Sequence, residues 1–252
     1  MEGPLIEIRG LRKSFGEQAV LAGVDLDIHR GETLAILGGS GTGKSVLVKH
    51  LVALLHPDGG SIRMEGREIT DLGGKALWKH RRRFGYLFQG AALFDSLDVG
   101  ENVGLGLREN TRKKPEEIAR IVAEKLRLVG LEGIERKRVA ELSGGMRKRV
   151  GLARAIALEP EILIYDEPTT GLDPVTGAVI GSLIEDMRRQ LQVTSLVVTH
   201  DLPLVERVAD RAVLLHEGRL IFDGDLRALY GAEHPHVQAF VAGQAPRPKE
   251  ES

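Results

Sequence analysis

The stretch LAILGGSGTGKSVLVKH, residues 34–50, constrains the fold of this chain more than any other part of the sequence. Its first four residues are apolar, and they have the length and the residue types of a buried strand. Closely spaced glycines follow, and apolar residues then recur at the spacing of a helix. The order of strand, glycine loop and helix predicts an α/β fold.

Residues 38–45 of this stretch fit the pattern G-x-x-x-x-G-K-[ST], the P-loop, and phosphate chemistry explains each residue type. Glycines let the backbone wrap closely, so that its N–H groups and the positive end of the helix dipole meet phosphate oxygens. Lys44 places a charge at the β- and γ-phosphates, and the Ser45 hydroxyl suits Mg²⁺. A dinucleotide fingerprint, G-x-G-x-x-G, fails because Val46 stands where its last glycine should be. The predicted nucleotide ligands are Gly38, Gly39, Ser40, Gly41, Thr42, Gly43, Lys44, Ser45 and Val46.

Composition excludes several other classes of function. The 252 residues suffice for one large or two small domains. A net charge of −1 and a pI of about 6.7 give no overall attraction to nucleic acid or to an anionic membrane. There is no cysteine, so disulfides and thiol chemistry are excluded. No apolar run reaches the roughly 20 residues of a membrane helix, and the N-terminus does not read as a secretory signal. We therefore expect a cytosolic protein, unless a partner holds it at a membrane.

Polar residues that end predicted strands are candidates for the chemistry of hydrolysis. An apolar strand predicted over residues 161–165 ends in Asp166, which can hold Mg²⁺ through water, and Glu167, which can deprotonate the attacking water. Gln89 follows a strand predicted at residues 84–87, where its amide can reach Mg²⁺ or a water. His200 follows the strand predicted at residues 195–199 and can hydrogen-bond a γ-phosphate.

A second helix start with anion-binding character lies in ELSGGMRKRVGLARAIAL, residues 141–158. Ser143 is the predicted N-cap, and no capping box closes over its hydroxyl because Met146 stands three residues on. The N–H groups of Gly144 and Gly145 are then available to an anion. Two glycines in a first turn cost roughly 1–2 kcal/mol of helix propensity, which a purely structural cap would not require.

The remaining patterns give the other elements. Alternating residues 5–9 and 24–28 predict half-buried antiparallel strands, and Phe15 between them either stacks on an adenine ring or is an ordinary core residue. Residues 61–64 form another predicted strand, residues 113–157 are predicted helical, and residues 211–216 and 219–223 form a hairpin. Asp173-Pro174 begins a helix whose apolar stripe comprises Val179, Ile180, Leu183, Ile184, Met187 and Leu191.

Histidines give no clear metal site. His234 and His236 are two residues apart, a spacing that suits a metal only on a strand, and no third ligand is evident. His29, His50, His56, His80 and His216 have no partner motif and are interpreted as surface or satisfied residues. The polar end, GQAPRPKEES, is expected to be disordered.

The order of these motifs resembles the ATPase subunits of ABC transporters over nearly the whole chain. The P-loop is followed by Gln89, LSGGM, ILIYDE, GLDP and His200. Three longer stretches, FQGAALFDSLDVGENV, LSGGMRKRVGLARAIALEPEILIYDEPTTGLDP and HPHVQAFVAG, are similar to the ATPases of Mla-type lipid transporters, also called toluene-tolerance or Mce-associated ATPases. Met146, where most relatives carry Gln, agrees with that subgroup.

This resemblance implies a fold and its domains. It implies a P-loop NTPase (RecA-like) core with an N-terminal antiparallel β-subdomain and an inserted α-helical subdomain. Residues 1–230 would form one ABC ATPase domain, with a core of about 1–88 and 158–230 and a helical subdomain of about 89–157. Residues 231–252 would be a C-terminal extension.

The resemblance also implies roles for single residues. Phe15 would stack on adenine, and the P-loop would bind the phosphates, with Lys44 also acting in catalysis. Ser45, Gln89 and Asp166 would serve Mg²⁺. Glu167 would be the general base, and His200 would sense the γ-phosphate. The residues Ser143, Gly144 and Gly145 would bind the ATP of a second subunit, and Asp173 would link the two sites.

A physical argument also favours a symmetric homodimer. The chain carries two anion-binding helix starts, and one nucleotide on the first leaves the outer face of the γ-phosphate open. Two chains related by a two-fold axis would place each signature over the other's P-loop. ATP would join the chains and hydrolysis would release them.

We therefore expect an ATP-binding and ATP-hydrolysing subunit that energises a membrane permease from the cytoplasmic side of the membrane and does not bind nucleic acid. The expected cargo is a phospholipid. The alternatives are a small-solute importer of the amino-acid type, a soluble ABC-type ATPase, and a module that binds ATP without turnover. Gly90–Leu107 is the predicted permease dock, and Pro235–Val241 is a candidate for a further protein contact, such as additional lipid-transport subunits, because of its apolar residues.

Overall fold

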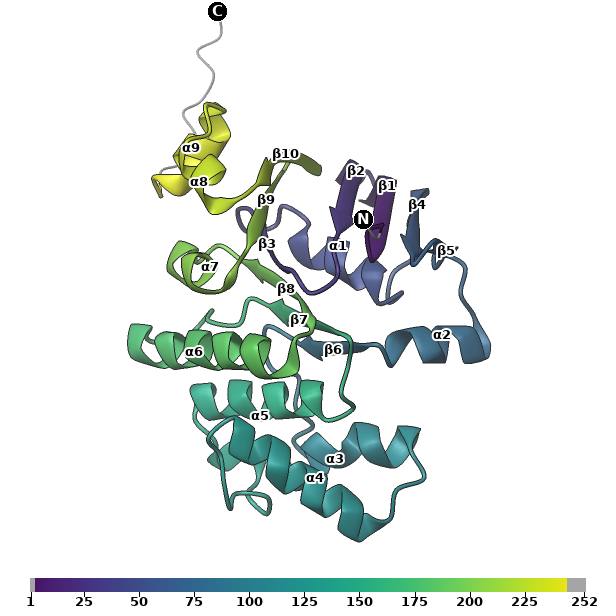
Figure 1. Cartoon of the computed structure of the whole chain (residues 1–252), viewed down its shortest axis with the longest axis vertical. Helices are drawn as coiled ribbons and strands as arrows, with labels where there is room; N and C mark the ends of the chain where they lie inside the picture. The colour runs from purple at the N-terminus through teal and green to yellow at the C-terminus, as the bar shows by residue number, and fades with distance from the viewer. Residues whose placement is uncertain (1–2, 244–252) are drawn as a thin grey trace, which may run out of the picture. The chain divides into compact units, whose positions relative to one another are not determined.

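The computed structural model describes residues 3–243, which fall into two compact units (Figure 1). The first unit comprises residues up to 72 together with those from 198 onward, and the second comprises residues 73–197. The chain returns from the second unit to the first within the strand β8 (Thr194–Thr199). Among the described residues, none of the helices has both the length and the apolar character needed to cross a bilayer.

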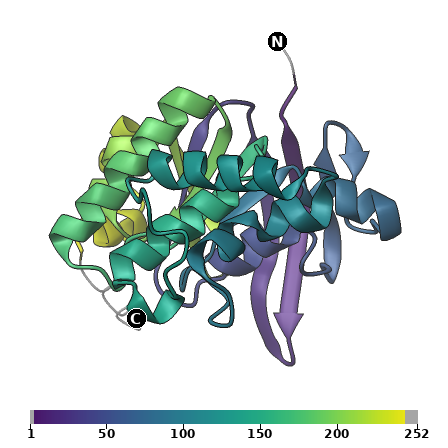
Figure 2. The ribbon, with the colours of Figure 1, turned by 90° about the horizontal axis from the view of Figure 1, so that it is seen from below.

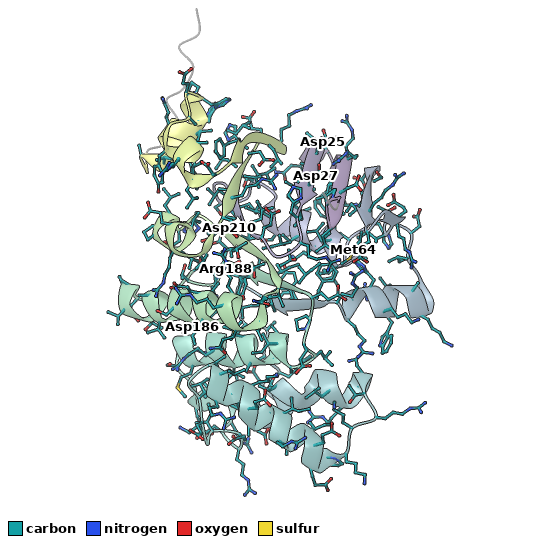
Figure 3. The ribbon with its side chains drawn as sticks, viewed as in Figure 1. Asp25, Asp27, Met64, Asp186, Arg188 and Asp210 are labelled. Carbon is teal, nitrogen blue, oxygen red and sulfur yellow. The ribbon has the colours of Figure 1, made fainter. Side chains whose placement is uncertain are left out.

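An antiparallel sheet in the first unit has the order β2-β1-β4-β5. Its strands are β1 (Ile6–Phe15), β2 (Gln18–Ile28), β4 (Gly59–Met64) and β5 (Arg67–Glu68). The two strands predicted from alternation are confirmed, but they are longer than predicted and end in a tight hairpin where Phe15 pairs with Gln18. Arg9 on β1 forms an ion pair with Asp27 on β2, with 2.6 Å between Nη1 and Oδ1 (Figure 3).

The first unit also contains the strand that leads into the P-loop. That strand, β3 (Thr33–Leu37), is fully buried and pairs in parallel with β9 (Arg211–His216). The starts of the two strands are joined because the Thr33 N–H donates to Asp210 Oδ2 at 2.9 Å (Asp210 is labelled in Figure 3). The predicted hairpin is confirmed: β10 (Arg219–Gly224) returns antiparallel to β9.

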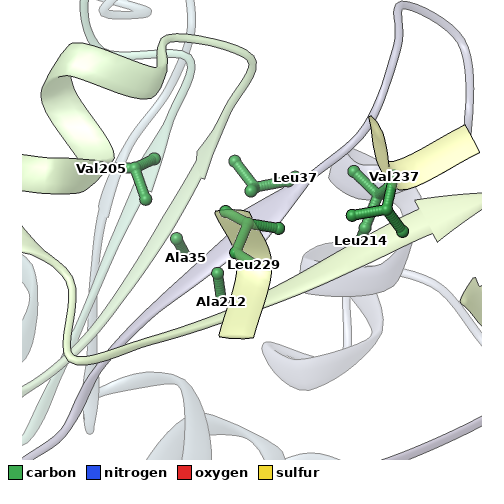
Figure 4. Close-up of a cluster of buried hydrophobic side chains, with 7 residues drawn as sticks. All are labelled: Ala35, Leu37, Val205, Ala212, Leu214, Leu229 and Val237. Atoms are coloured by element: carbon green, nitrogen blue, oxygen red, sulfur yellow. The ribbon is translucent and has the colours of Figure 1, made fainter. Parts of the chain in front are cut away.

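In the described part of this unit, the helices are α1 (Lys44–Leu51), α7 (Leu202–Val208), α8 (Leu226–Tyr230) and α9 (Pro235–Val241). The last three cover β3 and β9 through a buried apolar cluster, which Figure 4 shows in close-up. Val237 of α9 is fully buried in this cluster, and Phe240 and Val241 are half-buried against it. The apolar residues of α9 therefore pack onto the chain's own core, which explains their apolar character without a further protein contact; such a contact stays a prediction. Of the polar end predicted to be disordered, all but Gly243 lies outside the described residues.

In the second unit, two parallel strands carry the predicted catalytic residues at their ends. These are β6 (Phe84–Leu87) and β7 (Ile162–Asp166), with Leu87 opposite Tyr165. The helix α5 (Gly144–Ile156) packs closely on β6, since a Cβ on Gly85 would lie 2.3 Å from the carbonyl oxygen of Ala155. The helices α3 (Val99–Asn110) and α4 (Pro115–Leu128) pack against α5 and against each other (Figures 1 and 2).

The remaining helices of this unit are α2 (Gly74–Arg81) and α6 (Pro174–Leu191). The stripe predicted for α6 is confirmed at Ile180, Ile184 and Met187, which are buried, but Val179 is exposed. The prediction of helix over residues 113–157 is also too broad. Besides α4 and α5, that region contains an irregular stretch and the short 3₁₀ helix at Val139–Glu141.

The helix α3 is missing from the sequence-based prediction, which treats its first residues as part of a glycine-rich apolar segment. Asp98 caps this helix: it accepts from the Glu101 N–H at 2.6 Å, and the Glu101 side chain accepts from the Asp98 N–H at 2.9 Å. This reciprocal capping box offsets the weak helix propensity of the three glycines in α3.

Candidate functional site

The glycine loop of the first unit has a shape that only glycine permits at two positions. Gly38 has φ +152°, and a Cβ there would lie 2.5 Å from the carbonyl oxygen of Leu215. Gly43 has φ +100°, and a Cβ there would lie 2.9 Å from both Cγ1 and the carbonyl oxygen of Val20. At these two positions the loop packs closely against Leu215 and Val20. Its inner side stays open for a phosphate group because no side chain fills it.

Lys44 lies buried at the centre of this loop. Its Nζ donates to the carbonyl oxygens of Gly38 and Gly39, each at 2.9 Å, and Thr42 Oγ1 donates to the Gly39 oxygen at 3.0 Å. The ammonium group is therefore held over the loop where phosphate oxygens would compete for it. Ser45 and Val46 are half-buried in the first turn of α1, whose N-cap, Gly43, contributes no capping side chain.

Phe15 and His200, also in the first unit, are both exposed. Phe15 ends β1 with 49 % of its surface accessible, so it is not a core residue, and the alternative left open by the sequence is excluded. The ammonium of Lys13 lies 5.6 Å from the centre of the Phe15 ring. His200 follows β8, and the next residue, Asp201, caps α7 by accepting from the Leu204 N–H at 3.2 Å.

Asp166, in the second unit, is buried at the end of β7 and has a tyrosine partner. The hydroxyl of Tyr86 on β6 donates to Asp166 Oδ2 at 2.9 Å. Burial and the adjacent carboxylate raise the pKa of Tyr86 well above its ordinary value, so the phenol remains a donor at neutral pH. A buried carboxylate whose oxygen is oriented in this way is the hard oxygen ligand that Mg²⁺ prefers.

Glu167 follows directly, and its backbone is strained. Its φ of +49° lies in the left-handed region, which costs a non-glycine residue of order 1 kcal/mol. Its contacts include Thr170 Oγ1, which donates to Glu167 Oε2 at 2.9 Å, and two donors to the Glu167 carbonyl oxygen: Lys148 Nζ at 2.9 Å and the Thr170 N–H at 3.4 Å. Lys148 also donates to the carbonyl oxygen of Gln89, whose side chain is exposed.

The signature sequence begins α5 as predicted. Ser143 is exposed, and its Oγ accepts from the Met146 N–H at 3.2 Å. Gly144 is exposed, but Gly145 is buried, and a Cβ there would lie 2.4 Å from Cγ2 of Thr176 on α6. The second glycine therefore has a structural reason that sequence reasoning did not find, namely the close approach of two helices.

Asp173 caps α6, as its sequence context predicts. Its Oδ1 accepts from the Thr176 N–H at 3.0 Å and its Oδ2 from the Thr176 hydroxyl at 2.6 Å. These hydrogen bonds lower the pKa of Asp173, which keeps the exposed carboxylate ionised.

Three polar side chains around the acids were missed by the sequence analysis: Tyr86, Lys148 and Thr170. Of these, Lys148 could have been noticed in the sequence. It lies four residues before Leu152 and seven before Ala155, so it shares the buried face of α5 with them, where a lysine is unusual. The contact of Tyr86 joins residues 80 positions apart and has no counterpart in local spacing, whereas Thr170 lies only three residues after Glu167, in the same turn.

Two histidines pack against each other in the first unit. The ring of His216 on β9 stacks on that of His236 on α9, with 4.2 Å between ring centres, which agrees with the interpretation of His216 as a satisfied residue. His234 caps α9 by accepting from the His236 N–H at 3.3 Å. Within residues 3–243, no group of three His, Cys, Asp or Glu is arranged to hold a metal ion.

Comparison with known proteins identifies the family. A family model described as "ABC transporter" matches residues 21–170. The probable ribonucleotide transport ATP-binding protein mkl of Mycobacterium leprae is 46 % identical over 242 residues, 96 % of this chain and 70 % of that protein. Protein TRIGALACTOSYLDIACYLGLYCEROL 3, chloroplastic, of Arabidopsis thaliana is 40 % identical, covering 97 % of this chain and 75 % of that protein. The methionine import ATP-binding protein MetN of Brucella abortus is 43 % identical, covering 94 % and 64 %.

Solved structures agree with this assignment. A dimeric ATP-binding cassette in a post-hydrolysis state with ADP and Pi has a TM-score of 0.81 and 32 % identity, covering 88 % of this chain and 99 % of that one. The cassette cbiO1 of Clostridium perfringens has a TM-score of 0.82 and 32 % identity, covering 95 % of this chain and 96 % of that one. The predicted α/β cassette fold, the ATPase activity and the use of ATP with Mg²⁺ are thereby confirmed. The chain belongs to the ABC transporter family and is one of its ATP-binding ATPase subunits.

Proposed function

We propose that this ATPase energises a membrane permease that moves phospholipid. The proposed cargo is supported by the likeness of three long stretches to Mla-type lipid transport ATPases. It is also supported by 40 % identity to an Arabidopsis protein named after a galactolipid. The alternative, import of an amino acid or other small solute, is favoured by 43 % identity to a methionine import ATPase. The cargo contacts the permease, so the ATPase chain carries little information about it.

In the first unit, we assign nucleotide binding to the glycine loop and its neighbours. The exposed ring of Phe15 is free to stack on adenine, and Gly38–Ser45 with Val46 would bind the phosphates. Lys44 would exchange a loop carbonyl for a phosphate oxygen and neutralise charge that develops during transfer. His200 would donate to the γ-phosphate.

In the second unit, we assign hydrolysis to the ends of β6 and β7. Bound Mg²⁺ would neutralise negative charge on the phosphates, and its ligands in this unit would be Asp166 and Gln89. Glu167 would accept the proton of the attacking water. Its buried carboxylate is oriented by Thr170, which supports this role because a general base must point at the proton that it removes.

We propose that two chains share two ATP molecules. Ser143, Gly144 and Gly145 would meet the γ-phosphate bound to the partner, and Asp173 would link the two sites. The exposed Ser143 hydroxyl accepts one N–H, and its own proton remains to be donated to a phosphate oxygen. The dimeric state of a similar cassette supports this arrangement. The proposed domain division stays as predicted, with a helical subdomain at about residues 89–157.

The proposed permease dock narrows to the loop before α3. Phe94 has 51 % of its surface exposed, although a phenyl ring gains from burial. The buried Asn102 holds this loop rigidly: its side chain accepts from the Phe94 N–H at 2.8 Å and donates to the carbonyl oxygens of Phe94 and Asp98. In contrast, Val103 and Leu107 within the predicted Gly90–Leu107 segment are buried and support α3. The chain would therefore work at the cytoplasmic face of the membrane, held there by the permease.

The test is affinity purification of the chain from membranes in mild detergent, followed by identification of co-purified proteins and lipids. We expect integral membrane subunits and an enrichment of phospholipid over the same preparation without the tagged chain. Recovery of permease subunits whose ATP turnover responds to an amino acid, and not to phospholipid, would favour the alternative cargo. Recovery without any membrane protein would contradict the proposed role.

A further inference from the structure

Lys148 is a buried cation to which the hydrolysis scheme above gives no role. It lies on α5, one helical turn after the start of the helix, with 5 % of its surface exposed. Its Nζ donates to the carbonyl oxygen of Glu167 at 2.9 Å and also to that of Gln89. A single ammonium group therefore joins the signature helix, the segment after β6 and the acid that follows β7.

Burial of an ammonium group is unfavourable unless its charge and its donors are satisfied. Burial lowers the pKa of Lys148, and the carboxylates of Glu167 and Asp166 oppose that shift. Leu152 and Ala155, on the same buried face of α5, are apolar. An apolar side chain at such a position is often as good or better for stability, so the specific contribution of the cation lies in the two carbonyl groups that it holds.

One of these carbonyl groups belongs to a residue whose backbone needs support. Glu167 has φ +49°, a conformation that persists only where the surroundings hold it. Lys148 donates to its carbonyl oxygen at 2.9 Å, the Thr170 N–H donates to the same oxygen at 3.4 Å, and the Thr170 hydroxyl donates to its carboxylate, so both ends of the residue are held. If the shorter bond to the carbonyl oxygen, from Lys148, is lost, the peptide is held less firmly and the carboxylate can shift with it. A displacement of about 1 Å at a reacting group can cost on the order of 100-fold in rate.

We propose that Lys148 is a positioning residue for ATP hydrolysis. It fixes the backbone of Glu167, and thereby the direction of the carboxylate, and it ties this residue to Gln89 and to the signature helix. It touches no reacting atom. The proposal rests on the proposed role of Glu167 as general base. It also implies that a change in α5, or in the segment that carries Phe94, would alter hydrolysis through the Lys148 side chain.

The test compares Lys148→Met with a matched control on the same helix, Arg149→Met. Arg149 is also a partly buried cation that bonds backbone carbonyls, those of Val129 and Gly130 at 3.3 and 3.2 Å, but it does not contact Glu167. Lys148→Gln keeps N–H donors and serves as the conservative variant. For each protein, ATP affinity and stoichiometry, kcat and KM, and the melting temperature are measured.

We expect Lys148→Met to bind ATP with unchanged stoichiometry and a KM within about twofold of wild type, while kcat falls about 10- to 100-fold, the usual loss from an outer-shell contact. Lys148→Gln should recover part of that loss, and Arg149→Met should keep kcat within about twofold. A kcat for Lys148→Met equal to that of Arg149→Met overturns the inference. A loss of ATP-binding stoichiometry in proportion to kcat also overturns it, because Lys148 would then only support folding. If the Met variant is insoluble, the Gln variant is judged by the same criteria.

Glu167→Gln, measured in parallel, separates the two hypotheses. If Glu167→Gln does not turn over ATP and Lys148→Met does so normally, the positioning role alone is wrong. If Glu167→Gln turns over ATP at the wild-type rate, the assignment of the general base is wrong, and the role of Lys148 falls with it.

Discussion

Asp166 and Glu167 are adjacent in the chain, yet different groups hold their side chains. A phenol from the neighbouring strand bonds Asp166, and a hydroxyl three residues later bonds Glu167. The first carboxylate is thus fixed by the sheet, and the second by its own turn.

Glu167→Gln should bind ATP and lose turnover by at least about 100-fold, because an amide cannot accept the proton of the attacking water. The trapped ATP should then hold the dimer, which size-exclusion chromatography with ATP and Mg²⁺ would detect. Glu161→Gln is the control, since Glu161 pairs with Arg83 at the surface and should affect neither property. Hydrolysis by the Glu167 variant at a near wild-type rate would refute the assigned role.

Tyr86→Phe should raise the Mg²⁺ concentration for half-maximal activity about 10-fold, as loss of an outer-shell partner usually does. The ring stays in place, so only the hydrogen bond to Asp166 is lost. Tyr230→Phe is a matched control because its hydroxyl also bonds a carboxylate, that of Glu206 on α7, in another part of the fold. An unchanged Mg²⁺ dependence for Tyr86→Phe would show that the tyrosine does not orient the metal ligand.

Among the elements of the second unit, α5 packs against α3, α4, α6 and β6. Its N-terminus presents the signature residues, its buried face packs on β6, and Arg154 near its end donates to the carbonyl oxygens of Ala91 and Ala92, each at 2.6 Å. Those two alanines have positive φ angles, so the segment after β6 depends on α5 for its shape. The contact between Gly145 and Thr176 sets how closely α5 approaches α6.

Gly145→Ala should therefore lower the free energy of unfolding by about 1–3 kcal/mol through overpacking. Thr176→Ser removes Cγ2, the atom that the new methyl group would strike, and keeps the hydroxyl that bonds Asp173. The double variant should recover most of the lost stability in urea unfolding. If Thr176→Ser restores none of it, steric contact between the helices does not explain this glycine.

In the whole molecule, the proposed functional residues are distributed over the two units. The glycine loop, Phe15 and His200 belong to the first unit, whereas the acids, the signature and the exposed loop at Phe94 belong to the second. Docking at the Phe94 loop would therefore act first on the unit that holds the proposed catalytic acids.

Phe94→Asp should keep the isolated protein folded, with basal hydrolysis within about twofold of wild type, because the Phe94 side chain is exposed and its replacement removes little packing. It should reduce co-purification with membrane partners by about 10-fold or more, as expected for a hot-spot aromatic. Adding Leu97→Asp should deepen the loss, although Leu97 is half-buried and the double variant will be less stable. Leu54→Asp, another exposed apolar residue, is the control. Unchanged recovery of membrane partners would exclude this loop as the dock.

The sequence alone determined the features that depend on local geometry. Gly38–Ser45, the Ser143 and Asp173 caps, and the strands that end at Asp166 and His200 all follow from backbone freedom, capping and apolar patterning, which act over a few residues. The motifs that contain these features also indicated the family and its ATPase chemistry.

Tertiary structure alone decided which side chains meet. The hydrogen bonds from Tyr86 to Asp166 and from Lys148 to Glu167 join residues 80 and 19 positions apart, and no local pattern specifies such pairs. The burial of Val237 was misjudged for the same reason: its apolar side chain is visible in the sequence, but the surface that covers it is not. Local interactions fix what each segment becomes, whereas packing fixes what each side chain touches, and the positioning of the catalytic acids belongs to packing.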